Sequence, residues 1–334
     1  MSIEQKQGEP LLRVEHLKKY FPVKNSALFS KNGGTLYAVD DISFFVNYGE
    51  TFSLVGESGC GKTTVGKTIL QLYQPTAGDV FFEGKNLVGL KKRELREIRA
   101  NMQMVFQDPN SSLNPRMTIY DSIADIIKIH HRMERDALSK RVYELLDMVG
   151  LPSWFAERYP HEFSGGQLQR ACIARALALN PKFIVCDEPV SALDVSIQSQ
   201  VLNLLSDLKK ELSLSYLFIS HGLPAVKHIS DRIAVMYLGR IIEQADSAEL
   251  FANPLHPYTQ ALISAVPVPD PNQRRERIVL EGDVPSPIHP PKGCRFCTRC
   301  RYASEQCRTQ ESQLTEVKAG HFVACHLCKG SEEA

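Results

Sequence analysis

One stretch decides the fold of this chain: Phe52-Ser53-Leu54-Val55-Gly56-Glu57-Ser58-Gly59-Cys60-Gly61-Lys62-Thr63-Thr64. Its apolar start is typical of a short buried strand, and the rest fits the pattern G-x-x-x-x-G-K-S/T at every fixed position. The glycines let the backbone turn tightly with its N–H groups pointing inward, and the helix that follows offers its N-terminus to an anion. Lys62 adds a positive charge, and the Thr63 hydroxyl can ligate Mg²⁺. The stretch therefore predicts a site for the phosphates of a nucleotide.

The composition is that of a globular protein with a large α/β domain. The chain has 334 residues, of which 43% are hydrophobic and 23% charged, enough for one such domain and something smaller. Segments typical of strands alternate with segments typical of helices from about residue 11 to residue 240, which predicts a P-loop α/β fold. The net charge of +1 offers no overall electrostatic case for binding nucleic acid.

The sequence shows neither a membrane span nor a secretion signal. No apolar run reaches the roughly 18 to 20 residues that a membrane-spanning helix needs, and the segment from Met1 to Gln5 lacks the basic and apolar regions of a signal peptide. We therefore expect a cytoplasmic protein that acts at a membrane only through a partner that spans it. Nine cysteines in such a chain favour thiol or metal chemistry over a disulfide scaffold.

A second apolar strand pattern, Lys182-Phe183-Ile184-Val185-Cys186, ends on two adjacent carboxylates, Asp187 and Glu188. The carboxyl ends of parallel strands carry ligands in α/β sheets, so both acids are expected near the phosphate site. Asp187 is then placed to bind Mg²⁺ directly or through water, and Glu188 to orient and deprotonate an attacking water. The alternative is a strand followed by a turn with exposed acids.

A second glycine-containing segment, Phe163-Ser164-Gly165-Gly166-Gln167, precedes a helical pattern that runs to Leu177. Ser-Gly-Gly at a helix start forms an anion-binding nest, although it also serves as an ordinary helix cap. The chain has only one P-loop. Two phosphate cradles for one nucleotide suggest a site that is shared between two chains.

From about residue 11 to residue 265 the sequence resembles the ATP-binding cassette (ABC) family. The segment from Phe163 to Gln167 is similar to the family's L-S-G-G-Q motif, with Phe in place of Leu. Three further matches are Gln107 with the Q-loop, Ser191-Ala192-Leu193-Asp194 with the D-loop and His221 with the switch histidine. The family usually has Asp after that histidine, whereas this chain has Gly222. This departure puts the stiffness of the local backbone in question.

The resemblance implies a role for each motif residue. Phe21, or its neighbour Tyr20, is expected to stack on adenine. Lys62 and the loop amides would bind the β- and γ-phosphates, and His221 would hold the γ-phosphate and the water in line. The expected Mg²⁺ ligands are Thr63, Gln107 and Asp187. The expected ATP-binding residues are Phe21, Gly56, Glu57, Ser58, Gly59, Cys60, Gly61, Lys62, Thr63, Thr64 and Asp187, with Ser164, Gly165, Gly166 and Gln167 acting on the ATP of a head-to-tail partner.

The resemblance also implies a domain organisation. We expect an ATP-binding domain over residues 1–265, with a helical subdomain at about 108–180, and a Pro-rich and Cys-rich region over residues 266–334. The turn-rich segment Asp108 to Pro115 is predicted to be a surface loop beside the Q-loop. In the family this region receives a cytoplasmic helix of the membrane partner. The alternative is an ordinary connecting loop.

After about residue 250 the sequence becomes rich in proline, with Pro254, Pro257, Pro267, Pro269 and Pro271 followed by a second dense run. Such density predicts extended linkers around a small appendage. The stretch His256-Pro257-Tyr258-Thr259 resembles the C-terminal region of oligopeptide and dipeptide importer cassettes. This resemblance narrows the expected class to peptide importers, and the chain as a whole most resembles their F-type cassette subunit.

Six of the nine cysteines lie in this C-terminal region. Cys294, Cys300, Cys307 and Cys325 match the importers' pattern, which is associated with a 4Fe–4S iron–sulfur cluster, while Cys297 and Cys328 are additional. Four thiolates equally suit tetrahedral Zn²⁺, and Cys325-x-x-Cys328 is a common zinc half-site. Unmetallated thiols are the third possibility. A metal would help a region with so little core to fold.

The expected protein is the ATP-hydrolysing subunit of a bacterial ABC importer for oligopeptides or dipeptides, peripheral to the cytoplasmic face of the membrane. ATP and Mg²⁺ are its expected cofactors. Its expected partners are a second, different cassette, two membrane permease subunits and an extracytoplasmic substrate-binding protein. The alternatives are an importer ATPase for nickel or another small solute, and a soluble ABC ATPase with no transport role.

Overall fold

A computed structural model describes residues 9–23, 34–266 and 277–328. The chain divides into two compact units. The first takes in Met1–Phe45, Phe52–Val88 and His221–Ala334, and the second takes in Val46–Thr51 and Gly89–Ser220. The N-terminal segment Met1–Gln5 and the proline run Pro267–Pro271 lie outside the described residues.

The first unit contains a four-stranded sheet with the strand order β2-β1-β4-β5. Its strands are β1 (Leu12–Val23), β2 (Gly34–Val46), β4 (Ala77–Phe82) and β5 (Lys85–Asn86). The β1 strand pairs antiparallel with β4, and Leu12, Val14 and Leu17 of β1 are buried. The sheet therefore has an apolar face against the core of this unit.

The first unit also holds the strand run β11-β12-β10-β9-β3. The strands are β3 (Thr51–Val55), β9 (Arg232–Tyr237), β10 (Arg240–Asp246), β11 (Thr315–Lys318) and β12 (His321–Val323). The predicted strand before the P-loop is β3, which pairs parallel with β9. The antiparallel pairing of β12 with β10 makes His321–Val323 part of this run of strands. The sequence predicted a small appendage joined by linkers. The structure shows that two strands of this region, β11 and β12, are paired into the sheet.

The described residues of the first unit also form five helices, which lie between and after these strands in the sequence. They are α1 (Lys62–Ile69), α8 (Leu223–Ile229), α9 (Ser247–Ala252), α10 (Pro257–Ser264) and α11 (Glu305–Thr309). Pro257 occupies the first turn of α10, where its missing N–H removes no hydrogen bond. The His256 side chain caps the same helix by accepting a hydrogen bond from the Tyr258 N–H.

The second unit combines a parallel sheet with helices. Its strands are β6 (Met102–Val105), β7 (Phe183–Asp187) and β8 (Ser215–Ser220), with β7 in the middle. The helices are α2 (Lys92–Arg99), α3 (Pro109–Ser112), α4 (Ile119–His130), α5 (Arg135–Met148), α6 (Gly165–Leu177) and α7 (Val195–Leu212). Two single 3-10 turns lie at Ser153–Phe155 and Pro160–Glu162. Every residue of β7 is buried, as expected for a central parallel strand.

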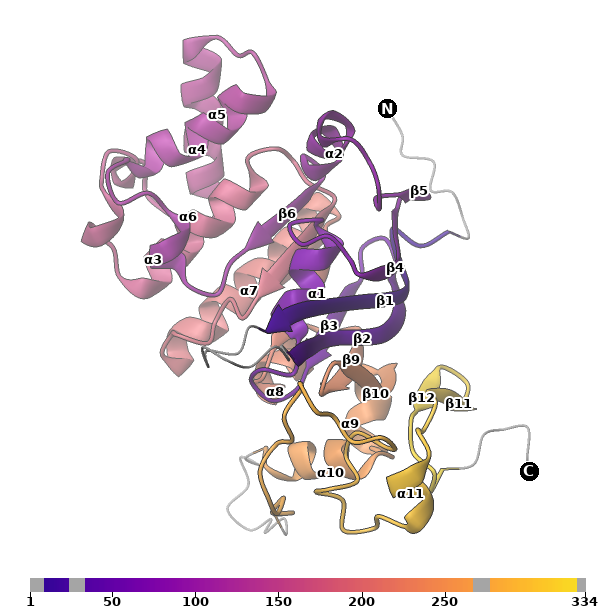
Figure 1. The fold of residues 1–334 in the computed structure, drawn as a ribbon. Helices are drawn as coiled ribbons and strands as arrows, with labels where there is room; N and C mark the ends of the chain where they lie inside the picture. Colours follow the sequence, from indigo (N-terminus) through magenta and orange to yellow (C-terminus); the bar gives the residue numbers. More distant parts are fainter. Residues whose placement is uncertain (1–8, 24–33, 267–276, 329–334) are drawn as a thin grey trace, which may run out of the picture. The chain divides into compact units, whose positions relative to one another are not determined.

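Helices α4, α5 and α6 pack against one another in Figure 1. Ile119, Ile123 and Ile127 recur every four residues along α4 and are all buried, which gives that helix an apolar stripe for the packing. The Thr118 hydroxyl caps α4 by accepting a hydrogen bond from the Asp121 N–H. The predicted P-loop α/β fold with an inserted helical part is confirmed.

One local prediction was wrong in part. The segment Asp108 to Pro115 contains the short helix α3 and the buried Pro109, so it is more than a surface loop. Asp108 caps this helix through a hydrogen bond from the Asn110 N–H, and Pro109 stands at its first position. The same residues that favour turns also favour a helix start, and Pro109 is buried where this helix begins.

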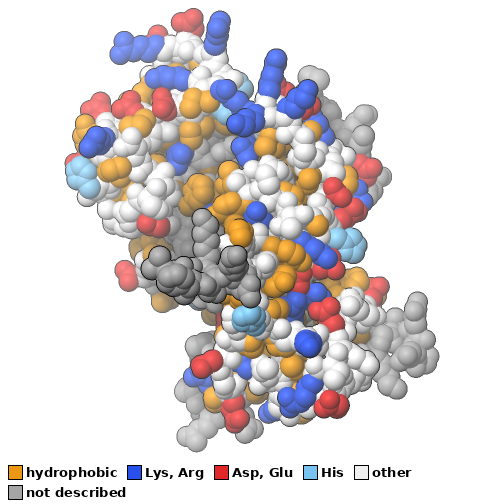
Figure 2. All heavy atoms as spheres, in the orientation of Figure 1, with side chains coloured by type: hydrophobic (Ala, Val, Ile, Leu, Met, Phe, Trp, Pro, Cys, Tyr) orange, Lys and Arg blue, Asp and Glu red, His pale blue; other side chains and the backbone are white. Residues whose placement is uncertain are grey.

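Charged side chains of both signs are distributed over the face of the molecule in Figure 2. Within the described ranges, none of the helices combines the length and the apolar character that a membrane span requires.

Candidate nucleotide-binding site

The P-loop connects β3 to α1 in the first unit. Two of its glycines are required by close backbone contacts. A Cβ atom on Gly61, which has a φ of +110°, would lie 2.0 Å from the Ala38 carbonyl oxygen. One on Gly56 would lie 2.2 Å from the Met236 carbonyl oxygen. Only glycine fits at these positions, so the loop keeps its tight turn.

Lys62 is held inside this loop. Its side chain is buried, and its Nζ donates hydrogen bonds to the carbonyl oxygens of Gly56 at 2.7 Å and of Glu57 at 3.0 Å. Ser58 and Gly59, at the tip of the loop, are exposed. A buried ammonium with exposed backbone beside it fits a phosphate ligand, because phosphate oxygens can accept the hydrogen bonds that the carbonyls now accept.

The two aromatic candidates for adenine stacking lie in different surroundings. The Tyr20 hydroxyl donates a hydrogen bond to Asp40, and its ring meets that of Tyr37 edge-on at 4.8 Å. The Phe21 ring meets Tyr73 at 5.5 Å, with the Lys19 ammonium 4.8 Å from its centre. Tyr20 is therefore engaged within the first unit through its hydroxyl, which leaves Phe21 as the better candidate.

His221 and Gly222 begin the last part of the first unit. His221 is exposed, and Gly222 is the N-cap of α8 with φ of −87° and ψ of 97°. Any residue can adopt such angles, so the backbone does not require glycine at this position. The departure from the usual Asp thus changes the side chain without imposing an unusual backbone.

In the second unit, Asp187 is the last residue of β7 and Glu188 follows it directly, so the predicted strand ends at these two acids. Asp187 is buried at the end of the strand. Glu188 follows with a φ of +46°, a left-handed conformation that is uncommon outside glycine. Its N–H donates to the Ile219 carbonyl at 2.8 Å, and its own carbonyl accepts from the Ser191 hydroxyl at 3.1 Å. Strained backbone that neighbours hold in place is common at functional carboxylates.

Gln107 and Glu188 are brought together in this unit. The Gln107 Nε2 atom donates a hydrogen bond of 2.9 Å to the Glu188 carboxylate. The amide oxygen is the end of Gln107 that could ligate a metal ion, since the nitrogen is the donor. Sequence reasoning predicted both residues for one site, and this contact joins them directly.

The segment Ser164 to Gln167 starts α6 in the second unit. The Ser164 hydroxyl accepts from the Gln167 N–H at 3.4 Å, and the Gln167 side-chain oxygen accepts from the Ser164 N–H at 3.0 Å. This reciprocal pair is a capping box. Ser164 and Gly165 are exposed, whereas a Cβ atom on Gly166 would lie 2.4 Å from the Ile197 side chain. Gly166 therefore lets α6 approach α7 closely.

The same helix also holds the residues that follow Gln107. Arg175 of α6 donates a hydrogen bond of 2.6 Å to the Ser112 carbonyl, and the Cys172 thiol lies 3.8 Å from the Pro109 carbonyl oxygen. Sequence reasoning missed this connection, because neither residue belongs to a motif. Only the spacing of Cys172 and Arg175 on one face of a helix could have suggested it.

The C-terminal cysteines of the first unit share one neighbourhood. The Cys294 N–H donates to the Cys307 carbonyl at 2.9 Å. Burial, followed by the nearby Cys325 and Cys307, raises the pKa of the Cys300 thiol. Cys325 and Cys328 share a hydrogen bond that raises the pKa of Cys325 and lowers that of Cys328. The nine cysteines are free thiols.

This arrangement does not yet fit a metal ion. Within residues 9–23, 34–266 and 277–328, His, Cys, Asp and Glu side chains form no group of three or more that could hold one. The donor atoms suit iron–sulfur or zinc chemistry, but the thiols would have to move closer together to serve as ligands.

Comparisons with known proteins agree with this geometry. The family model described as "ABC transporter" matches residues 39–191, and the one described as "Oligopeptide/dipeptide transporter, C-terminal region" matches residues 242–307. The ATP-binding cassette MJ0796, in a post-hydrolysis state bound to ADP and Pi, superposes with a TM-score of 0.62 at 29% identity over 71% of this chain and 98% of that one. The fold and the site therefore define an ABC ATPase.

Curated relatives cover nearly the whole chain. The oligopeptide transport ATP-binding protein AppF of Bacillus subtilis is 53% identical over 96% of this chain and 98% of its own length. The probable peptide ABC transporter ATP-binding protein y4tS of Sinorhizobium fredii is 50% identical over 96% of this chain and 90% of its own. The chain belongs to the oligopeptide/dipeptide family of ABC transporter ATP-binding proteins.

Proposed function

We propose that this chain is the ATP-hydrolysing subunit of a bacterial importer for oligopeptides or dipeptides. The main observation that supports peptides as the transported solute is the similarity to AppF, which extends over 96% of the chain and includes the C-terminal region. The family model for the C-terminal region of oligopeptide/dipeptide transporters matches residues 242–307, which lie beyond the residues 39–191 that the general ABC transporter model matches.

The proposed chemistry uses each motif for one task. Lys62 and the P-loop amides bind the β- and γ-phosphates of ATP, and Phe21 stacks on the adenine. Thr63, Gln107 and Asp187 are the proposed Mg²⁺ ligands, and the metal would stabilise charge that develops on the phosphates. Glu188 accepts the proton of the attacking water, and His221 orients that water. The contact between Gln107 and Glu188 supports their common role.

The exposed start of α6 supports a shared reaction site. Ser164 and Gly165 face solvent in the described chain, and the Ser164 cap leaves the first amides of α6 at an exposed helix N-terminus. We propose that this segment acts on the ATP of a second cassette in a head-to-tail pair. ATP then favours the closed pair, and its hydrolysis removes that preference.

The proposed assembly and organisation follow from the same family. The chain would lie at the cytoplasmic face of the membrane, with a second cassette, two permease subunits and an extracytoplasmic substrate-binding protein. The ATP-binding domain would extend over residues 1–265 with its helical subdomain at about 108–180, and the Cys-rich region over 266–334. Helix α3 and the residues beside it, held by Arg175, would receive the permease.

The cysteines are proposed to bind a metal cofactor, either a 4Fe–4S cluster or Zn²⁺, through Cys294, Cys300, Cys307 and Cys325. Their common neighbourhood supports this assignment, which requires the thiols to move closer together when the metal binds. Protein purified without oxygen should be brown and absorb near 400 nm if the cofactor is iron–sulfur. Colourless protein with one zinc per chain would favour zinc, and protein with neither metal would refute the proposal.

The decisive experiment is purification of the tagged chain from its own membranes in mild detergent. We expect permease subunits to co-purify and the reconstituted complex to import labelled peptides with ATP. Nickel uptake in the same vesicles is the control for another cargo. Recovery of an active ATPase without any membrane partner would contradict the transport function.

A further inference from the structure

The cysteine-rich segment Cys294-Arg295-Phe296-Cys297-Thr298-Arg299-Cys300 carries two arginines that point into the first unit. The side chains of Arg295 and Arg299 are each only 9% exposed. Arginine is seldom buried without a partner, because removal of its charge from water is costly. Both side chains should therefore have acidic partners within this unit.

The partner of Arg299 is Glu57, the residue that follows the first glycine of the P-loop. The Arg299 Nη1 and Nη2 atoms lie 2.9 Å and 3.3 Å from the two Glu57 carboxylate oxygens, which is a bidentate ion pair. Burial lowers the pKa of Arg299, but the hydrogen bond to Glu57 and the neighbouring Tyr237 raise it further than burial lowers it. A paired guanidinium of this kind fixes the carboxylate in position as well as in charge.

Every polar part of Glu57 is held. Its N–H donates a hydrogen bond of 3.0 Å to the Tyr258 hydroxyl. Its carbonyl oxygen accepts from the Lys62 Nζ at 3.0 Å. Its carboxylate accepts from Arg299. The side chain that Arg299 holds therefore belongs to the same residue whose backbone contacts the phosphate-binding lysine.

Phe296 fixes the segment that presents Arg299. Its ring is 1% exposed and lies 5.3 Å from the Tyr237 ring and 5.4 Å from the Tyr258 ring. Tyr258 is the residue whose hydroxyl accepts the Glu57 N–H. Aromatic contacts and the ion pair thus connect the cysteine-rich segment to the P-loop at two points.

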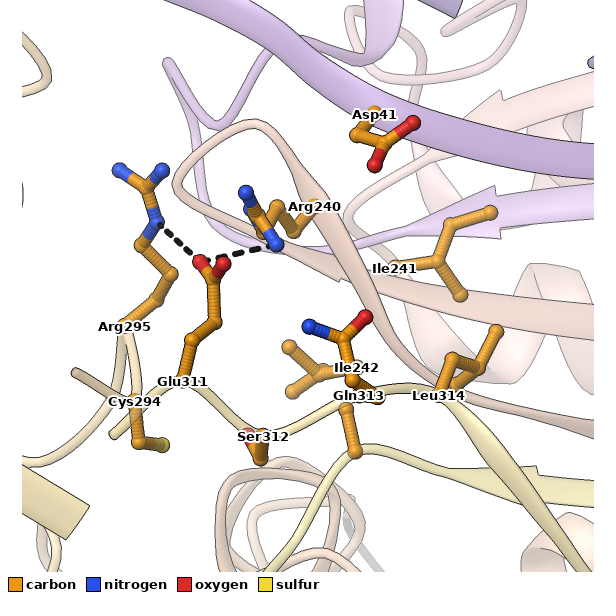
Figure 3. A pocket seen from close by; sticks show the side chains of 11 residues that line it. Asp41, Arg240, Ile241, Ile242, Cys294, Arg295, Glu311, Ser312, Gln313 and Leu314 are labelled. Carbon is orange, nitrogen blue, oxygen red and sulfur yellow. Dashed lines mark ion pairs between the residues drawn. The ribbon is translucent and has the colours of Figure 1, made fainter. Parts of the chain in front are cut away.

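Arg295 anchors the same segment a second time. It forms an ion pair with the buried Asp40, which also binds Arg240 at 3.1 Å and accepts the Tyr20 hydroxyl. Figure 3 shows ion pairs from Arg240 and from the Nε atom of Arg295 to Glu311, beside a cavity of about 60 Å³. With both arginines engaged, the segment has little freedom to turn away from the P-loop.

We propose that Arg299 is a positioning residue for the phosphate-binding loop and that it acts through Glu57. The proposal rests on the proposed binding of ATP by this loop. Arg299 touches neither nucleotide nor metal in this scheme. Because it holds the Glu57 side chain, it limits the motion of the carbonyl that contacts Lys62, and so favours the loop conformation that accepts phosphate.

The test compares Arg299→Ala, Arg299→Lys, Glu57→Gln and the double variant in the full chain, alone and in the reconstituted complex. The control is Arg301→Ala, since Arg301 directly follows this segment but is exposed and stacks on Tyr302. ATP affinity is measured by titration with a fluorescent ATP analogue. Turnover is measured as KM and kcat.

We expect Arg299→Ala to weaken ATP binding and raise KM about fivefold or more, with kcat changed less than twofold. Arg299→Lys should recover part of the affinity, because lysine keeps the charge but not the bidentate geometry. In the Glu57→Gln background the loss of Arg299 should have little further effect. Arg301→Ala should bind ATP like the wild type.

Equal ATP affinity in the wild type and Arg299→Ala would overturn the inference, as would full additivity with Glu57→Gln. A purely structural role would instead lower the melting temperature and the active fraction while KM stays constant. If Arg299→Ala fails to fold, Arg299→Lys and Glu57→Gln give the same comparison. Failure of the wild type to bind ATP would contradict the proposed function, which separates the two ideas.

Discussion

The P-loop and the segment Ser164 to Gln167 both start a helix and both contain glycine, yet they are held in different ways. The P-loop residue Glu57 is bound by Tyr258 and Arg299, which lie 201 and 242 residues away in the sequence. The start of α6 is held by a capping box within four residues and by close packing of Gly166 on α7. One segment depends on remote parts of the chain, and the other is almost entirely local.

This difference fits two different tasks. A loop that binds phosphate within its own chain gains affinity if it is already in the bound conformation, because less conformational entropy is lost on binding. A segment proposed to meet the nucleotide of a second chain must stay accessible, and Ser164 and Gly165 are exposed. Changes to the two segments should therefore separate nucleotide affinity from turnover.

The largest effect is expected from Glu188→Gln. The amide cannot accept a proton from water, so ATPase turnover should fall at least a hundredfold, while ATP binding persists and the paired state accumulates. Steady-state phosphate release and nucleotide titration measure the two properties. Turnover near the wild-type rate would contradict the assignment of Glu188.

A smaller effect is expected at the segment Ser164 to Gln167. Ser164→Ala removes the cap of α6, at a cost of about 1 kcal/mol in helix stability. Turnover of the assembled complex should fall severalfold while the dilute chain binds ATP with unchanged affinity. Ser199→Ala, in an exposed part of α7, is the matched control. If Ser164→Ala lowered the ATP affinity of the isolated chain as much as Arg299→Ala does, the two segments would not differ in their roles in ATP binding.

The smallest effect concerns the C-terminal strands. His321 on β12 is buried and its Nε2 lies 2.8 Å from the Glu243 carboxylate on β10, which raises the pKa of His321 above its usual 6.5. The protonated pair stabilises the fold below pH 6.5, and this contribution is lost as the pH rises through the raised pKa. We expect the wild type to exceed His321→Gln in stability by about 1 kcal/mol at low pH.

Urea unfolding at a series of pH values between 6 and 9 checks this difference. The gap between the wild type and His321→Gln should narrow as the pH rises, because glutamine keeps a donor but cannot titrate. His326→Gln is the control, since His326 is half-buried in the same region and its Nε2 contacts the Gln310 carbonyl. A gap that is constant with pH would mean that the pKa of His321 is the same in the folded and unfolded states, which would contradict the raised pKa.

Much of the fold was predictable because its signals are local. Each of these signals is contained in a short continuous stretch of sequence. They are the apolar strand before Gly56, the acids after Cys186 and the helical spacing after Gln167. The strand pairing of β12 with β10 was not predictable, because Phe322 and Val323 carry no motif and their partners lie about 80 residues earlier. The conformation of Glu188 was also hidden, since its positive φ depends on hydrogen bonds with Ile219 and Ser191.

The sequence by itself was enough to predict that the chain binds nucleotide and to identify the residues of the P-loop. It also identified Asp187 and Glu188 as the two carboxylates at the end of β7. These features depend on local backbone geometry, because glycine permits and proline restricts backbone conformations in any part of a chain. Only the tertiary structure decided that Arg299 reaches Glu57 and that β12 pairs with β10. Such contacts are selected by the packing and burial of the whole unit, which no local stretch encodes.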